Sequence, residues 1–233
     1  MELTRKSFVA AAGLGLAAPF AGGNAIASVT PQESPLHFHV LGRHEYDSAA
    51  MLSTIASPKT QKQVFLSINP LLLAGNASLY VHMQNSMNAF EFSFGQGPGS
   101  LATLGIVSGP STVYGLNDAM WTKYGFGAAL NLAPTNVYYR AKSLAANGAP
   151  DDPNAIYQDW SAQAVLRRGG SFMLCHNAMT FVASLVAPGR GMTTQAVLSE
   201  FERNVQPGFL VVPAAVAAMQ LALEHGWNSY EVI

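Results

Sequence analysis

The sequence has 233 residues, with 12 lysines and arginines, 13 aspartates and glutamates, and a formal net charge of −1. Charged residues make up 11% of the chain, against roughly a quarter in ordinary soluble domains. We expect other subunits to cover part of so charge-poor a surface. Near-neutral charge, without basic runs interleaved with aromatics, argues against nucleic acid as a partner.

The first 27 residues are predicted to be an export signal of the twin-arginine type. Arg5 and Lys6 precede an uncharged stretch over 8–32, and Ala25-Ile26-Ala27 has the small-x-small pattern that signal peptidase recognises. Lys6 stands where a second arginine is usual. An uncleaved membrane anchor is the alternative, but proline and glycines interrupt the stretch. We therefore expect a periplasmic or otherwise exported protein, without a stable membrane anchor, whose single domain covers 28–233.

The first elements of this domain are predicted to be short. Residues 36–41 are strand-like. Asp47 is placed to cap a helix over 48–56, which Ser57-Pro58 stops. Residues 63–68 form an apolar run that is typical of an extended segment.

A helical period begins at Ala77 and lasts to about Gly95. Apolar residues recur there at spacings of three and four, namely Tyr80, Met83, Met87 and Phe90. A glycine-rich loop over 95–99 then precedes a buried strand over 101–107. Ser108-Gly109-Pro110-Ser111 turns the chain, and a helix is predicted to run through residues 120 and 121.

The middle of the chain is less regular before the alternation resumes. Residues 131–150 are predicted to be an excursion from the core. Asp151-Asp152-Pro153 predicts the start of a helix, and Arg167-Arg168-Gly169-Gly170 its end. The strand 171–175 follows, and helical residues, including a helix capped by Thr194, extend to Arg203.

The C-terminal part is predicted to hold the last strand and a closing helix. Residues 209–212 form the strand, and the helix begins at Pro213 and ends at His225-Gly226-Trp227. Strands separated by helices favour an α/β fold with a mainly parallel sheet and helices on both faces.

The only cysteine, Cys175, lies where an apolar strand meets the start of a helix. Backbone N–H groups at a helix start stabilise a thiolate. In an exported protein, an unpaired cysteine indicates a reactive thiol or an intermolecular bridge. The alternative is a buried cysteine that packs as a small hydrophobe.

The C-terminal third resembles the DsrE/DsrF-like domain family. The resemblance rests on the strand and turn over 172–177, on Val211-Val212-Pro213-Ala214-Ala215-Val216, and on His225-Gly226-Trp227. The strand 101–107 with Ser108-Gly109-Pro110 is similar to the family's strand-plus-Gly-Pro turn. Ala215 stands where the family carries glycine. The resemblance implies a three-layer α/β domain assembled as a trimer or hexamer, with Cys175 at the position that carries sulfur as a persulfide in several relatives.

This resemblance implies a site around Cys175 that needs no cofactor. His176 and Asn177 are candidates to hydrogen-bond the terminal sulfur or to move a proton. Ser108 and Gly109 are expected to line the same crevice, because ligands bind at the carboxyl ends of strands in open α/β sheets. A solvent-facing turn for His176 and a helix cap for Asn177 are the structural alternatives.

The other histidines supply a rival site. His37, His39 and His44 are candidates to gather a metal, with Glu45 and Asp47 nearby, although histidines close to a mature N-terminus are more often incidental. His82 lies on the polar side of the 77–95 helix, where it is able to reach a pocket or simply face solvent. We expect no metal centre.

Several other chemistries lack their sequence signals. The Gly95-x-Gly97-x-Gly99 run precedes a strand instead of following one, so its context is not that of a dinucleotide site. The sequence contains no Gly-x-Ser-x-Gly elbow and no Cys-x-x-Cys pair.

Two functions of different classes remain open. One is an exported protein that carries or transfers sulfane sulfur through Cys175, with a donor or acceptor protein as its partner. The other is a non-catalytic, oligomeric binding protein of the same fold in which Cys175 is buried and inert.

Overall fold

The computed structural model describes residues 37–143, 145 and 148–232. The predicted signal peptide over 1–27 and the first residue of the predicted strand 36–41 lie outside the described residues.

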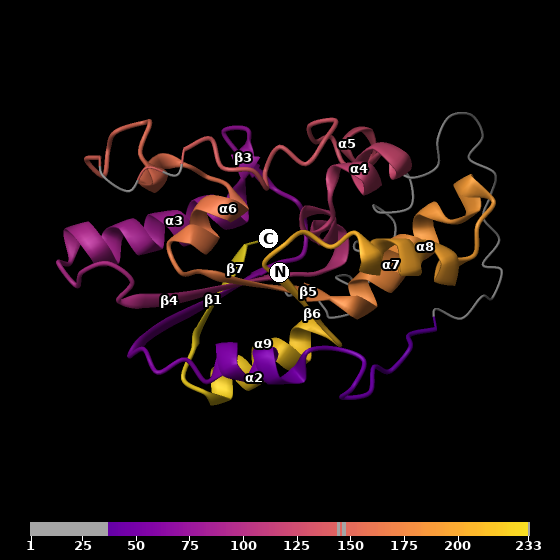
Figure 1. Cartoon of the computed structure of the whole chain (residues 1–233), viewed down its shortest axis with the longest axis horizontal. Helices are drawn as coiled ribbons and strands as arrows, with labels where there is room; N and C mark the ends of the chain where they lie inside the picture. Colours follow the sequence, from indigo (N-terminus) through magenta and orange to yellow (C-terminus); the bar gives the residue numbers. More distant parts are fainter. Residues whose placement is uncertain (1–36, 144, 146–147, 233) are drawn as a thin grey trace, which may run out of the picture.

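A five-stranded, wholly parallel sheet forms the centre of the molecule, in the order β6-β5-β4-β1-β7 (Figure 1). This arrangement confirms the predicted α/β fold. The central strand β4 is buried along all seven residues, as expected of a parallel strand that is covered on both faces. The strands are β1 (Gln61–Ser67), β4 (Leu101–Val107), β5 (Ser171–Cys175), β6 (Phe209–Val212) and β7 (Asn228–Val232).

Helices cover both faces of the sheet and complete three layers. One face packs against α2 (Ser48–Ile55) and α9 (Ala215–Glu224), which lie below the sheet in Figure 1. The opposite face packs against a larger group of helices, namely α3 (Ser78–Asn88), α6 (Ala162–Arg167), α7 (His176–Val186) and α8 (Thr194–Arg203).

Shorter elements join these layers. A two-stranded hairpin precedes α3, a 3-10 segment follows β4, and two short helices follow that segment. These and the remaining short elements are β2 (Leu72–Leu73), β3 (Asn76–Ala77), the π-helical η1 (Ala89–Ser93), η2 (Gly109–Gly115), α4 (Asp118–Tyr124), α5 (Phe126–Ala129), η3 (Ile156–Gln158) and η4 (Pro188–Arg190).

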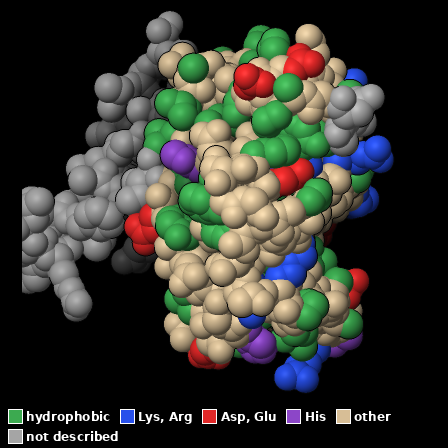
Figure 2. All heavy atoms as spheres, turned by 90° about the vertical axis from the view of Figure 1, so that its left-hand side faces the viewer, with side chains coloured by type: hydrophobic (Ala, Val, Ile, Leu, Met, Phe, Trp, Pro, Cys, Tyr) green, Lys and Arg blue, Asp and Glu red, His purple; other side chains and the backbone are tan. Residues whose placement is uncertain are grey.

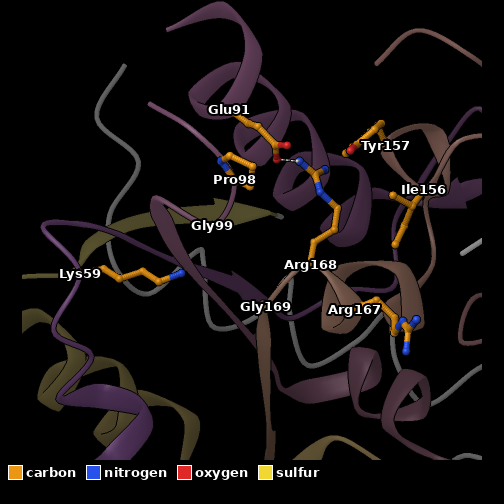
Figure 3. A pocket seen from close by; sticks show the side chains of 9 residues that line it. All are labelled: Lys59, Glu91, Pro98, Gly99, Ile156, Tyr157, Arg167, Arg168 and Gly169. Carbon is orange, nitrogen blue, oxygen red and sulfur yellow. Dashed lines mark hydrogen bonds and ion pairs between the residues drawn. The ribbon is translucent and has the colours of Figure 1, made fainter. Parts of the chain in front are cut away.

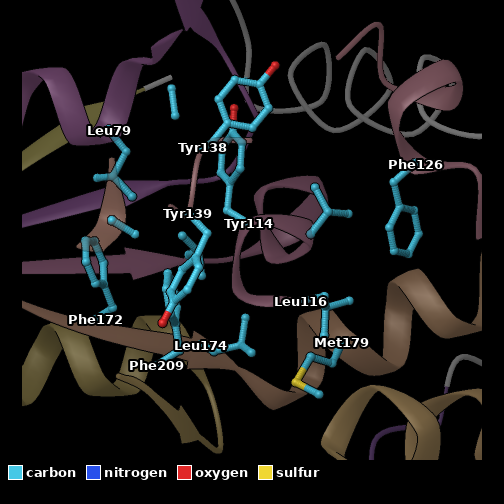
Figure 4. Packing of buried hydrophobic residues seen from close by; sticks show 14 of the residues in the cluster. Leu79, Tyr114, Leu116, Phe126, Tyr138, Tyr139, Phe172, Leu174, Met179 and Phe209 are labelled. Atoms are coloured by element: carbon cyan, nitrogen blue, oxygen red, sulfur yellow. The ribbon is translucent and has the colours of Figure 1, made fainter. Parts of the chain in front are cut away.

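Aromatic side chains fill the larger core on the α3 side of the sheet (Figure 4). Phe172 of β5 stacks on Phe209 of β6, with ring centroids 4.7 Å apart, and meets the edge of Tyr80 from α3 at 5.3 Å. Gly105 makes this packing possible, because a Cβ atom there would lie 2.7 Å from the Phe172 ring. Each such fully buried side chain contributes roughly 1.5–3 kcal/mol.

Most predicted elements are present at the expected places. Asp47 caps α2, where its side chain accepts a hydrogen bond from the backbone N–H of Ala50 at 2.8 Å. The helix from Ala77 is α3 continued by η1, and Tyr80, Met83 and Met87 are buried on its inner side. The described residues between 131 and 150 form no helix or strand, which confirms the predicted excursion.

Four local predictions are wrong. The described part of 36–41 is not a strand. The helix expected at Asp151 begins only at α6, where Ser161 caps it, because Asp152 closes a turn on the N–H of Asn154. The cap of α8 is Thr193, one residue before the predicted Thr194. The fourth error is the strand count, because β7 follows the strand that was expected to be the last.

The ends of the other elements agree closely with the sequence patterns. Helix α6 ends at Arg167, and Gly169 adopts a positive φ of 88° just beyond it. Helix α9 begins two residues after Pro213 and ends before Gly226. None of the helices in the described part of the chain has the length and apolar character needed to cross a bilayer.

Candidate functional site

The segments that follow three central strands meet at the carboxyl ends of those strands. Cys175 ends β5 and leads without a linker into α7, Ser108 and Gly109 follow β4, and Ala214 and Ala215 follow β6. Because neighbouring parallel strands end at the same edge, residues far apart in the sequence converge there. The Cys175 side chain belongs to the smaller core, on the α2 and α9 face of the sheet.

The Cys175 sulfur is held by backbone donors from two helices. As the N-cap of α7, its Sγ accepts the N–H of Ala178 at a donor–acceptor distance of 3.4 Å. It also accepts the N–H of Ala215, the first residue of α9, at 3.2 Å. N–H groups at helix starts favour negative charge on the atom that they contact, so this arrangement suits a thiolate at Sγ.

A pocket of about 280 Å³ opens beside this sulfur. Cys175 contributes to its lining although only 4% of the residue is exposed. Ser108, Gly109 and Asn177 line the same pocket, so the structure brings together four of the six residues selected from the sequence. The remaining lining is apolar, and among the described residues that form it only Cys175 is ionisable. Its other members are Phe38, Ala178, Phe181, Ala214, Ala215 and Val216.

His176 follows Cys175 in the sequence, but its side chain lies in the contact between α7 and α8. Its ring is buried, with 2% of the residue exposed, and Nε2 lies 3.0 Å from Glu202 Oε1 of α8. It does not line the pocket, and its Nδ1 has no partner among the described residues. The alternative of a solvent-facing turn residue is wrong, since the helix start directs this side chain into the contact between α7 and α8.

The positions of Asn177 and His82 also differ in part from those predicted from the sequence. Asn177 lies in the first turn of α7 and is not its cap, a role that Cys175 takes. Its backbone N–H donates to the carbonyl oxygen of Pro213 at 3.3 Å, which ties α7 to the loop after β6. His82 is exposed on α3 and does not belong to the Cys175 pocket.

The N-terminal histidines do not assemble a cluster. His39 Nε2 contacts Glu45 Oε1 at 2.8 Å. The backbone N–H of Gly42, followed by the His39 ring, lowers the pKa of Glu45 below its ordinary value. Within the described ranges, no group of three or more histidine, cysteine, aspartate or glutamate side chains is arranged to hold a metal ion.

The sequence interpretation missed the apolar part of the pocket. Phe181 was recognisable, because it lies four residues after Asn177 and helical residues at that spacing share a face. Phe38 gave no such signal, since it reaches the pocket from a segment without regular structure that lies more than a hundred residues before Cys175 in the sequence.

Comparisons with protein-family models, with curated proteins and with solved structures gave no significant match to this chain.

Proposed function

We propose that this protein carries sulfane sulfur as a persulfide on Cys175. The observation that carries the proposal is the position of Cys175, which lines a pocket while its Sγ accepts backbone N–H groups from the starts of α7 and α9. Two helix-start donors stabilise negative charge on Sγ, which favours the thiolate that attacks a sulfur donor. The sequence resemblance to the DsrE/DsrF-like family supports the same role.

The chemistry is a sulfur exchange that needs no separate oxidant. The Cys175 thiolate attacks the outer sulfur of a donor R–S–SH, which is a short polysulfide or the persulfide of a partner protein. A new bond forms between Sγ and that sulfur, the donor's S–S bond breaks, and R–S⁻ leaves with the electron pair and takes up a proton. Cys175 becomes Cys–S–SH, and attack by an acceptor thiolate on its outer sulfur returns the thiolate.

The surrounding residues have distinct parts in this proposal. The carboxamide of Asn177 and the hydroxyl of Ser108 supply polar groups in an otherwise apolar pocket, where they are available to hydrogen-bond the outer sulfur. Gly109 adopts a positive φ of 51° and lies close to Ile68, so it shapes the wall without a side chain of its own. His176 acts as a positioning residue through its contact with Glu202.

The proposal also includes the localisation and the oligomeric state of the protein. The basic, uncharged and small-residue pattern over 1–27 supports export to the periplasm. The resemblance and the charge-poor composition support a homo-oligomer, a trimer or hexamer, that exchanges sulfur with a donor or acceptor protein.

A second function has its own supporting observation. Cys175 packs in the smaller core with Met173, Val212 and Ala215, and the pocket beside it has mainly apolar walls. These features suit a non-catalytic, oligomeric protein that binds an apolar ligand while its cysteine stays inert.

The deciding experiment measures sulfur uptake by the folded protein. After exposure to polysulfide and removal of excess reagent, we expect the intact mass to increase by whole sulfur atoms and to return to its original value with a small thiol. Labelling by an alkylating reagent should proceed in the native protein and should depend on pH, because the thiolate is the reacting form.

Cys175→Ser is the matched variant, since it keeps a small side chain that is able to cap α7. It should retain the wild-type circular dichroism spectrum and gain no sulfur. Alkylation that begins only after unfolding would support the inert cysteine of the second function and would overturn sulfur carriage.

A further inference from the structure

A second and larger pocket lies at the opposite edge of the sheet, where the strands begin. It has a volume of about 530 Å³ and is shared by segments that precede β1, β4 and β5 (Figure 3). Lys59 comes before β1, Pro98 and Gly99 come before β4, and Arg168 and Gly169 come before β5. This pocket is separate from the Cys175 pocket, which shares none of its lining residues.

Basic residues are concentrated in this pocket. Lys59, Arg167 and Arg168 line it, which is three of the chain's 12 lysines and arginines, whereas Glu91 is the only carboxylate in the lining. In a chain with so few charges, such a grouping gives the pocket an excess of positive charge.

The Arg168 guanidinium is held by hydrogen bonds within the protein and forms one side of the pocket. Only 6% of its side chain is exposed, and its nitrogens donate to Gln84 Oε1 and Asn88 Oδ1 at 2.6 Å and to Glu91 Oε2 at 2.9 Å. It also lies over the Tyr157 ring, 4.9 Å from the centroid. Arg168 and Glu91 neutralise each other, so the charge excess comes from the other two cations.

Lys59 and Arg167 differ in the groups that offset their positive charges. Arg167 lies in the last turn of α6, where the partial negative charge of the helix end offsets its own charge. Lys59 makes no ion pair with any described residue, and the hydrogen bond that its Nζ makes within the described part of the chain is a 3.4 Å contact with the carbonyl oxygen of Leu101. Lys59 and Arg167 are therefore both unpaired among the described residues, and Figure 3 shows the Lys59 side chain pointing toward the other labelled residues of the pocket, whereas the Arg167 side chain points away from them.

Glycine keeps the space beside this ammonium group open. Gly99 has a positive φ of 67°, and a Cβ atom there would lie 3.6 Å from Lys59 Nζ. Across the pocket, Gly169 has a φ of 88°. Pro98 is exposed and supplies apolar surface next to the charged part, whereas Ile156 and Tyr157, which also line the pocket, are 2% and 9% exposed.

We propose that this pocket binds a small amphipathic molecule that carries an oxyanion, with the Lys59 ammonium group as its counter-charge. The oxyanion is a carboxylate or a phosphate, since both accept charge-assisted hydrogen bonds from an ammonium group. The apolar part of the ligand lies against Pro98, which is exposed in the lining. The inference is independent of sulfur carriage, because it uses no residue of the Cys175 pocket.

The test is a titration of the full chain followed by NMR, with the backbone amide signals of Gly99 and Gly169 as local reporters. Phenyl phosphate and phenylacetate are the anionic probes, benzyl alcohol is the neutral probe, and inorganic phosphate tests the anion without an apolar part. We expect saturable shifts of both glycine signals with at least one anionic aromatic probe, and weaker binding of benzyl alcohol and of inorganic phosphate. The tighter of the two anionic probes identifies the head group.

Lys59→Gln is the deciding variant, and it should weaken binding of the anionic probe by roughly tenfold, the effect of losing one charge-assisted hydrogen bond. Lys59→Arg keeps the charge and should bind within about threefold of the wild type. Lys142→Gln removes a lysine outside this pocket and should have no effect. Dispersed spectra confirm that the variants fold.

Three outcomes would overturn the proposal. The first is the absence of saturable shifts with either anionic probe. The second is equal affinity for benzyl alcohol and the anionic probes, which would remove the role of charge. The third is unchanged affinity in Lys59→Gln, which would show that the anion binds elsewhere.

Discussion

Arg168 shows how one residue joins distant segments of this fold. It follows α6, yet its side chain contacts α3 through Gln84 and Asn88 and reaches Glu91 in η1. Both members of the ion pair are nearly buried, with side-chain exposures of 6% and 11%. Burying two charges is costly, and removing one partner alone leaves the other without compensation.

We therefore expect Arg168→Met to lower the free energy of unfolding by about 3 kcal/mol, because Glu91 would remain buried and unpaired. Urea denaturation followed by circular dichroism measures this loss. Arg167→Met is the matched control, and it should stay within about 0.5 kcal/mol of the wild type because Arg167 is exposed and makes no ion pair with a described residue. Equal losses in the two variants would mean that the buried pair contributes nothing specific.

At the scale of elements, the short helix α5 supports the irregular excursion that follows it. Gly127 of α5 is buried directly beneath the backbone of residues 133 and 134. A Cβ atom at Gly127 would overlap the carbonyl oxygen of Ala133 and lie 2.8 Å from the Cα atom of Pro134. Backbone atoms yield less easily than the end of a flexible side chain, so the excursion would have to shift.

Gly127→Ala should therefore destabilise the protein, by at least about 1 kcal/mol, the lower end of the cost of overpacking. Gly189→Ala is the matched control, since nothing lies within 4 Å of its added Cβ and its φ is not positive. That control should be neutral or stabilising by up to about 1 kcal/mol, because alanine reduces the entropy of the unfolded chain. Thermal unfolding of both variants compares them, and a stable Gly127→Ala would contradict the close packing.

The elements that were predictable from sequence are those with strong local signals. The strand β4 is a continuous apolar run, and Asp47 and Gly169 mark helix boundaries by their own chemistry. The junction of β5 and α7 at Cys175 was predictable for the same reason.

The errors concern elements that are decided by distant contacts. Strand β7 is mostly exposed and carries no apolar run, so its extended form depends on pairing with β1, more than 160 residues earlier. The side-chain direction of His176 depends on Glu202 in another helix. The start of α6 depends on how Asp152 closes its turn instead of capping a helix. None of these contacts leaves a periodic pattern in the sequence.

At the scale of the whole molecule, the chain is poor in charged residues, which make up 11% of it. The face seen from the left-hand side of Figure 1 shows mostly backbone and uncharged side chains, with scattered groups of charged side chains (Figure 2). The β2–β3 hairpin and the residues before it add four neighbouring apolar side chains that are 39–48% exposed, namely Ile68, Leu71, Leu72 and Leu73. Apolar residues gathered in this way are typical of surfaces between subunits.

We expect the mature protein to be a homo-oligomer in which this hairpin is covered. Light scattering during size exclusion should give a mass above that of the monomer at micromolar concentrations. The double substitution Leu72→Glu and Leu73→Glu should reduce it to the monomer mass, because a buried interface does not accept unpaired carboxylates. Leu223→Glu on α9, also at an exposed leucine, should leave the assembly intact. A wild-type monomer would remove this explanation of the charge-poor surface.

The pairing of β7 with β1 also determines when the sheet is completed during synthesis of the chain. Strand β1 lies between β4 and β7, so one of its two hydrogen-bonding neighbours is made early and the other only at the end of the described chain. While the ribosome is still producing α7, α8 and α9, the β7 side of β1 has no strand beside it, and exposed strand edges are prone to pair with other chains. The nascent protein therefore completes its sheet only after residues 228–232 have emerged, and until then the β7 side of β1 stays open to pairing with other chains.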